Sequence, residues 1–305
     1  MITEYPLPGR NFTWIDVQEP HSHDFERLST EFNLPYLLVQ DTLRPEHLPK
    51  YEFTEEGHFL MMRNFDSESD KEATTVQELT RKIALFITDD RLITIHRVDL
   101  DYLHNVAERA RKSDLPKTMQ GLVHKVVLAA IKSYEQPVSN LQDLYDGFEQ
   151  DILEKKAQSL STKRIYTFRR QLFVIKRILR QTNDALLRFK EFWGEHPSML
   201  QDLRENIDQH YFQLDEISSN FEHLFQLHIS LNDQRANEVM KILTVFSSIL
   251  LPLNFLASFY GMNFNALPGL DSKGALWILV AVMVFLSLIS IWFFRRRGWF
   301  NTVKE

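Results

Sequence analysis

The sequence predicts an α+β domain that is followed by a long helical stalk and two C-terminal transmembrane helices. Three observations predict this fold class. Short β-branched and aromatic runs alternate with helical stretches in the first part of the chain. The segment from Ser198 to Leu251 then contains neither Gly nor Pro, and two long uncharged apolar runs follow near the end. The overall hydrophobic share of 44% hides this division, because the strongly apolar sequence is concentrated at the C-terminal end.

The composition excludes several classes of function. The chain has no cysteine, so a bound metal would need oxygen or imidazole ligands. The net charge of −6 gives no reason to expect a nucleic-acid partner. No Gly-rich phosphate loop, nucleophile elbow or HExxH motif is present, so nothing indicates an enzyme. The N-terminal MITEYPLPGRNF lacks the apolar core of a secretory signal, and we expect the first domain to be cytosolic.

Residues 1–116 are predicted to form the mixed α/β domain. The hairpin signal is Asp89-Asp90 between two apolar runs, and Pro116 marks the boundary of the domain. The expected strands are Phe12–Asp16, His58–Arg63, Ile83–Thr88 and Arg91–His96, and the expected helices are His23–Phe32 and Asp101–Lys112.

Helix-forming and charged residues dominate the next part of the chain. Residues 117–197 are predicted to form an antiparallel helical pair, with Gln120–Leu160 disturbed at Pro137 and Thr162–Phe192 after a short connection. Residues 198–241 form the stalk, which continues without a breaker into the first apolar run. At about 1.5 Å per residue, the helix from 198 to 251 would be about 80 Å long.

The two apolar runs predict a membrane hairpin. The first span is 242–260 and the second is 275–294, and each is close to the ~20 residues that cross a bilayer. The loop 261–274 carries few charges, whereas the tail 295–305 begins with three arginines, so the positive-inside rule places both termini in the cytosol. A buried helical hairpin in a soluble core is the alternative interpretation.

The first span carries a polar stripe along one helical face. Thr244, Ser247, Asn254 and Ser258 follow one another at helical steps when Leu251 is included, and the face continues upstream through Met240 and Asn237. Such a stripe indicates contact with water or with other helices rather than lipid. Several copies that turn the stripe inward would enclose a pore, while packing between helices through Ser and Thr explains the spacing equally well.

The chain resembles the CorA family of divalent-cation channels. The resemblance rests on YGMN at 260–263 directly after the first span, on NEVMKILT at 237–244, and on LPYLLVQD at 34–41 with PKYE at 49–52. It covers most of the chain and implies a funnel-shaped homopentamer with an αβα cytosolic domain, in an inner membrane whose lipid surrounds the two spans.

The resemblance also implies the residues of an ion path and a regulatory site. Gly261, Met262 and Asn263 would form the selectivity motif, and metal bound between subunits at Asp41 and Asp202 would hold the channel closed. The expected pore-lining residues are Asn237, Met240, Leu243, Thr244, Ser247, Leu251, Asn254 and Ser258. The transported and regulatory ion would be a hydrated divalent cation, magnesium with cobalt or nickel, and no cofactor, nucleotide or nucleic acid is required.

One departure from the family pattern leaves the identity of the ion open. Many members carry a Glu in a Met-Pro-Glu-Leu stretch after the motif, whereas this chain has Leu267-Pro268-Gly269-Leu270. The ZntB branch of the family shares GMN but lacks that acid too and moves zinc, so a zinc transporter, proton-coupled or not, is an alternative. A membrane-anchored structural or adaptor protein is the alternative from another class.

Overall fold

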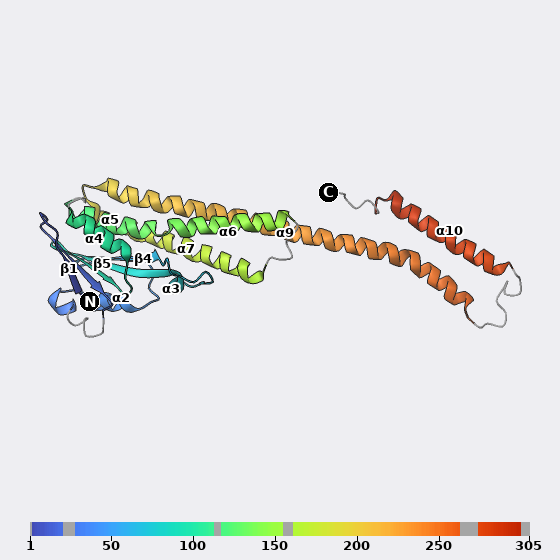
Figure 1. Cartoon of the computed structure of the whole chain (residues 1–305), viewed down its shortest axis with the longest axis horizontal. Coiled ribbons are helices and arrows are strands. Elements are labelled where there is room, and N and C mark those ends of the chain that lie inside the picture. Colours follow the sequence, from blue (N-terminus) through green and yellow to red (C-terminus); the bar gives the residue numbers. More distant parts are fainter. Residues whose placement is uncertain (1, 21–27, 113–116, 155–160, 263–273, 300–305) are drawn as a thin grey trace. The chain divides into compact units, whose positions relative to one another are not determined.

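The computed structural model describes residues 2–20, 28–112, 117–154, 161–262 and 274–299. The chain divides into two compact units, residues 1–224 and 225–305. The 64-residue helix α9 (Pro197–Tyr260) contributes to both units. Figure 1 shows the helices and strands in chain order. The predicted fold class, an α+β domain followed by a long helix and two C-terminal apolar helices, is confirmed.

The first unit is built on a six-stranded sheet with the order β1-β2-β6-β5-β4-β3. The β2 and β6 strands pair in parallel, and the other neighbours pair antiparallel. All four predicted strands form, and the predicted hairpin connects β5 to β6. The bounds are β1 Ile2–Tyr5, β2 Thr13–Gln18, β3 Lys50–Thr54, β4 Gly57–Phe65, β5 Thr80–Ile87 and β6 Arg91–His96.

Both faces of the sheet are covered. Residues such as Val17, Phe59 and Ile93 form one core with Leu38 and Val39 of α2 (Tyr36–Leu43). The alternate positions of the strands face the opposite side, where α4 (Asp101–Arg111) and α5 (Met119–Lys132) lie (Figure 1). The short α3 (Val76–Leu79) begins with a Thr75–Glu78 capping box. Within the predicted helix 23–32 the structure describes residues 28–32, of which 28–31 are helical, and the remainder lies outside the described residues.

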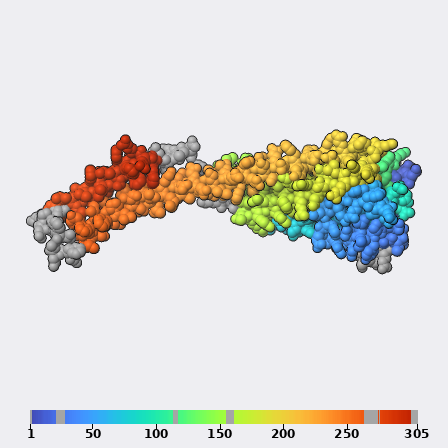
Figure 2. All heavy atoms as spheres, turned by 180° about the vertical axis from the view of Figure 1, so that it is seen from behind, coloured from blue at the N-terminus to red at the C-terminus, as the bar shows by residue number. Residues whose placement is uncertain are grey.

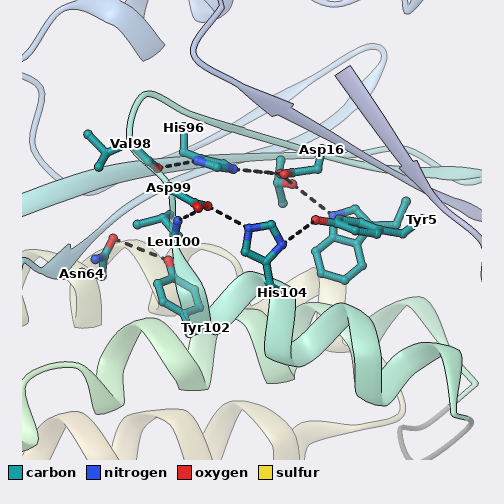
Figure 3. Close-up of polar contacts among 11 residues, drawn as sticks. Tyr5, Asp16, Asn64, His96, Val98, Asp99, Leu100, Tyr102 and His104 are labelled. Carbon is teal, nitrogen blue, oxygen red and sulfur yellow. Dashed lines mark hydrogen bonds and ion pairs between the residues drawn. The ribbon is translucent and has the colours of Figure 1, made fainter. Parts of the chain in front are cut away.

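A buried ion pair joins the parallel strands β2 and β6. His96 Nε2 lies 3.1 Å from each carboxylate oxygen of Asp16, and His96 Nδ1 lies 2.7 Å from the carbonyl oxygen of Val98 (Figure 3). Thr94 donates to Asp16 and accepts a hydrogen bond from Trp14 Nε1 at 3.0 Å. Because a carbonyl and a carboxylate both accept hydrogen bonds, this geometry fits an imidazolium that donates from both ring nitrogens.

Three long helices complete the first unit: α6 (Glu135–Leu153), α7 (Thr162–Arg188) and the first part of α9, with the single-turn α8 (Lys190–Trp193) before α9. The rings of Phe148, Phe168 and Phe221 connect α6, α7 and α9 at centroid distances of 4.7–5.7 Å. The helix predicted over 120–160 with a disturbance at Pro137 is interrupted at residues 133–134, between α5 and α6. Pro137 instead lies in the first turn of α6, where the missing N–H costs little.

The second unit contains the C-terminal part of α9 and α10 (Ala275–Arg296). Both helices are long and apolar enough to cross a membrane, with hydropathies of 1.9 and 2.6 in their most apolar windows. Pro252 lies inside α9 without ending it. Of the most apolar 18-residue stretch, only 6% is buried within the chain in α9 and 0% in α10. Core helices of a soluble protein would be mostly buried, so the exposure favours the membrane interpretation over the buried hairpin.

Candidate ion path and regulatory carboxylates

The eight predicted pore-lining residues are all exposed in the single chain. Exposed fractions reach 60% for Met240, 57% for Leu243 and 70% for Leu251. Asn237 and Asn254 are also exposed, and 17 residues of helix separate them by about 25 Å. The set therefore forms a continuous strip of carboxamide, hydroxyl and apolar side chains along α9.

The face of α9 opposite the strip is the less exposed one. Val245 is buried, and Ile249, Leu253 and Leu256 are half-buried, which places the covered residues at helical steps. A helix turns by about 100° per residue. The face of Val245 therefore points roughly 160–200° around the helix axis from the strip of predicted pore-lining residues. On α10 the half-buried positions also recur at helical steps; they are Leu279, Met283, Leu286, Ser287, Ser290 and Phe294. The polar strip therefore lies on the more exposed side of α9.

One hydroxyl of the strip is bonded within its own helix. Thr244 Oγ1 donates to the carbonyl oxygen of Met240 at 2.7 Å, and Ser287 on α10 makes the same bond to Met283 at 2.9 Å. This back-bonding satisfies the donor without a partner helix. It fits both interpretations of the strip, since the hydroxyl oxygen can still accept a hydrogen bond from water or a neighbouring helix.

The helix α9 ends where the Gly-Met-Asn motif begins. Gly261 N donates to Ala257 O at 3.0 Å, and Met262 N donates to Phe259 O at 3.4 Å. A Cβ added at Gly261 would lie 3.1 Å from that same Ala257 oxygen, so glycine allows the close approach that ends the helix. Asn263 lies outside the described residues, and its role remains a prediction.

Asp41 lies near the C-terminal end of α2, and basic side chains already hold its carboxylate. Lys50 Nζ lies 2.7 Å from Asp41 Oδ2, and His47 Nε2 lies 3.2 Å from Oδ1. Burial alone would raise the pKa of Asp41, but the hydrogen bond and charge of Lys50, aided by His47 and Arg44, hold that pKa below its ordinary value. The carboxylate is thus ionised and neutralised by its own chain.

Two lysines lie close to Asp41. Lys50 Nζ also lies 2.5 Å from Glu52 Oε1. Lys82 Nζ donates to the carbonyl oxygens of Asp41 at 2.7 Å and Arg44 at 2.6 Å. Burial, followed by the nearby charge of Arg63, lowers the pKa of Lys82 to about 7. A divalent ion at Asp41 would have to displace Lys50, so in the single chain this carboxylate fits a regulatory metal poorly.

Asp202 is more accessible. Its side chain is 50% exposed, and His124 Nε2 on α5 lies 2.8 Å from its Oδ2. Burial lowers the pKa of His124, although the hydrogen bond to Asp202 opposes that shift. Asn206 donates to the Asp202 carbonyl oxygen at 2.7 Å. One carboxylate oxygen with a neutral imidazole beside it suits a metal better than the ion-paired Asp41.

The single chain does not bring the two regulatory candidates together. Among the described residues, no hydrogen bond or ion pair joins Asp41 to Asp202, and no cluster of three or more carboxylates and imidazoles is placed to hold a metal. The partners Lys50 and His124 were not predicted. Alternation along β3 does place Lys50 and Glu52 on one face, a signal available in the sequence, whereas His124 is 78 residues from Asp202.

Comparison with known proteins establishes the family. The family model described as CorA-like Mg²⁺ transporter protein matches residues 9–296, and the chain belongs to this family. The cobalt/magnesium transport protein CorA of Thermotoga maritima is 24% identical over 97% of this chain and 86% of its own length. The complete structure of the CorA magnesium transporter from Methanocaldococcus jannaschii has a TM-score of 0.77 and 22% identity over 95% of this chain and 92% of its own.

A branch relative matches less of the chain. The ZntB cytoplasmic domain from Vibrio parahaemolyticus has a TM-score of 0.60 at 13% identity and covers 75% of this chain and 89% of that structure. At these identities the two structural likenesses establish the fold alone. Both likenesses cover the α+β domain, and the likeness to the complete structure also covers the long helix and the C-terminal apolar helices.

Proposed function

We propose that the chain is the subunit of a homopentameric channel that conducts magnesium, and also cobalt or nickel, into the cytosol across the inner membrane. The observation that carries the proposal is the exposed strip on α9, which lies opposite the less exposed face of that helix. A single strip cannot enclose water. Five copies that turn it toward a common axis would line a pore, with α10 outside against lipid. Membership of the CorA-like Mg²⁺ transporter family supports this arrangement.

The side chains of the strip suit a hydrated divalent cation. Magnesium is small and releases its water reluctantly, so a ring of neutral carboxamides can hold the ion through its hydration shell. A ring of carboxylates would bind the ion too tightly for rapid exit. Asn254, Asn237 and, at the outer mouth, Asn263 would supply such rings. Leu243 and Leu251 between them would close the path by dewetting when the pore narrows.

The membrane potential is a sufficient driving force. A divalent cation gains about 4.6 kcal/mol per 100 mV of inside-negative potential, from about 2.3 kcal/mol per charge. No nucleotide or chemical reaction is needed, and the protein would be a transporter rather than an enzyme. Arg295, Arg296 and Arg297 at the end of α10 support cytosolic termini by the positive-inside rule.

Regulation by cytosolic metal is proposed at Asp202 in preference to Asp41. The exposed Asp202 carboxylate has a lone pair available beside His124, whereas Asp41 is neutralised by Lys50 and is also contacted by His47. Metal at Asp202 would be completed by ligands from a neighbouring subunit. Replacing Asp41 and Asp202 together with Ala, and each one singly, tests the assignment through inhibition of uptake by internal magnesium. Inhibition that survives the double change unaltered would exclude both residues.

A zinc transporter of the ZntB type is the second candidate function. The missing acid around Gly269 is the sequence observation that favours it, since cation attraction at the mouth is reduced. An adaptor protein anchored by the hairpin is the candidate from another class, and it predicts no ion flux at all.

Flux into liposomes that contain the purified protein tests the proposal. We expect magnesium uptake under an inside-negative potential, a nearly complete loss in Asn263→Ala, and little change in the matched control Asn265→Ala. Both variants should assemble as the wild type does. Absence of any divalent flux would contradict the channel, and wild-type flux through Asn263→Ala would remove the selectivity ring from the account.

A further inference from the structure

Charge is segregated between two neighbouring helices of the first unit. The α7 helix carries eight Lys and Arg residues and one acidic residue, Asp184. The part of α9 within the first unit carries six Asp and Glu residues and one arginine, Arg204. Figure 2 shows α7 in yellow-green and this part of α9 in yellow on one side of the unit. Lys176 of α7 pairs with Asp215 of α9. This one ion pair does not account for the other charged side chains on the outer faces of the two helices.

The outer face of α7 is basic and aromatic. Tyr166, Arg169, Phe173, Arg177 and Arg180 recur at helical steps and are all exposed; we call them the α7 stripe. Tyr166 is 61% exposed and Phe173 is 53% exposed. Within the described residues, none of the three arginines makes an ion pair or hydrogen bond to a carboxylate. The stripe is therefore a positively charged surface whose arginines have no anionic partner among the residues that the structure describes.

The outer face of α9 in the same unit has the opposite charge. Glu205, Asp208, Phe212 and Glu216 recur at helical steps and are exposed; we call them the α9 stripe. Phe212 is 70% exposed. Glu205 accepts a hydrogen bond from Gln201 at 2.7 Å, and no basic side chain among the described residues pairs with any of the three carboxylates.

The two stripes match in length as well as in chemistry. The α7 stripe extends about 21 Å and the α9 stripe about 17 Å at 1.5 Å per residue. Each combines three like charges with at least one exposed aromatic ring. Aromatic residues and arginine are enriched at the centres of protein interfaces, and opposite charges around them orient the partners.

We infer that the α7 stripe of one copy docks on the α9 stripe of a second copy, with Phe173 and Phe212 near the centre of the contact. The inference rests on the homo-oligomer of the proposed function and identifies a cytosolic contact within it. The two stripes are different surfaces, so the contact can be repeated in one direction around a ring. Its salt bridges are surface interactions, which give orientation more than affinity.

The absence of cysteine allows a direct test by disulfide cross-linking of the full chain. Two differently tagged copies are coexpressed, one with Phe173→Cys and the other with Phe212→Cys, and mild oxidation should join them into a covalent heterodimer. Because each chain has one thiol, a bond within a chain is impossible. The matched control replaces Phe212→Cys by Phe53→Cys, which is equally exposed at 70%. Absence of the heterodimer, or equal yield with the control, would overturn the inference.

Charge reversal provides a second readout that is independent of transport. Changing Arg169, Arg177 and Arg180 to Glu should reduce the cross-linking yield at least threefold. Changing Glu205, Asp208 and Glu216 to Lys in addition should restore the yield. The yield of the Phe173→Cys and Phe212→Cys pair without charge changes should also fall at 1 M salt, where the screening length is about 3 Å. Failure of the combined change to restore cross-linking would contradict the pairing. Loss of binding to anionic vesicles in the arginine variant, with cross-linking unchanged, would assign the stripe to lipid instead. The control reverses Arg109, Arg111 and Lys132, which are exposed elsewhere.

Discussion

The buried His96–Asp16 pair predicts that the first unit loses stability as the pH rises. Burial alone would lower the pKa of His96, but Asp16, the Val98 carbonyl and Asp99 together raise it above the ordinary value of 6.5. The folded state therefore holds a proton that the unfolded chain has released. Stability from this pair is fully present below pH 6.5 and is lost as the pH rises through the raised pKa of His96.

The perturbation that tests this is Asp16→Asn, which removes the negative partner and leaves the imidazolium buried. The side chains are 5% and 2% exposed, and breaking a buried pair by removing one partner costs about 3–5 kcal/mol. Between pH 6.5 and the raised pKa, the difference between wild type and variant should shrink by up to about 1.4 kcal/mol per pH unit. At higher pH the neutral imidazole makes the loss smaller.

Hydrogen exchange measured by mass spectrometry on peptides of β2 and β6 in the full chain is the assay. Wild type and variant are compared at the same pH, which removes the intrinsic pH dependence of exchange. The matched control is His104→Gln, because His104 pairs with Asp99 at 2.8 Å but both side chains are more than half exposed, and the change should cost less than about 1 kcal/mol (Figure 3). A difference between wild type and Asp16→Asn that stays constant or grows with pH would contradict the raised pKa of His96.

Three further changes test other parts of the account. Phe168→Ala should destabilise the first unit by about 3–5 kcal/mol, because Phe168 is 1% exposed and joins three helices; a loss below 1 kcal/mol in denaturant unfolding would contradict that packing. Gly261→Ala should slow magnesium uptake severalfold without altering assembly, since its Cβ would press on Ala257 O; unchanged uptake in liposomes would show that the helix end tolerates the methyl group. Lys50→Met should free the Asp41 carboxylate. The internal magnesium concentration that inhibits uptake should then be at least threefold lower than in the control Lys132→Met. An unchanged concentration would mean that Asp41 does not bind metal in either form.

The elements that depend on local sequence were the ones that could be predicted. The absence of Gly and Pro after Ser198 and the uncharged run at its end are sufficient to predict α9, and the same holds for α10. The β1 and β3 strands were missed because they lie at the two edges of the sheet, where neither has a buried face that would produce alternation. The α2 helix was missed because its apolar residues run consecutively rather than at helical steps.

The site could be predicted in part for the same reason. Helical spacing within one segment revealed the polar strip on α9, because its members are close in sequence. The partners of the two regulatory carboxylates depend on tertiary contacts, such as the 78 residues between His124 and Asp202. The buried pair of His96 and Asp16, 80 residues apart, could not be found from spacing either. Only the parallel pairing of β2 and β6 brings those two side chains together.

We propose above that the chain forms a magnesium channel driven by the membrane potential. It is tested most directly by competition between magnesium and zinc for uptake into proteoliposomes, with the potential and the proton gradient varied independently. We expect magnesium uptake to rise with inside-negative potential, to be independent of the proton gradient, and to be reduced little by equimolar zinc. Zinc uptake that follows the proton gradient, with little magnesium flux at any potential, would contradict it.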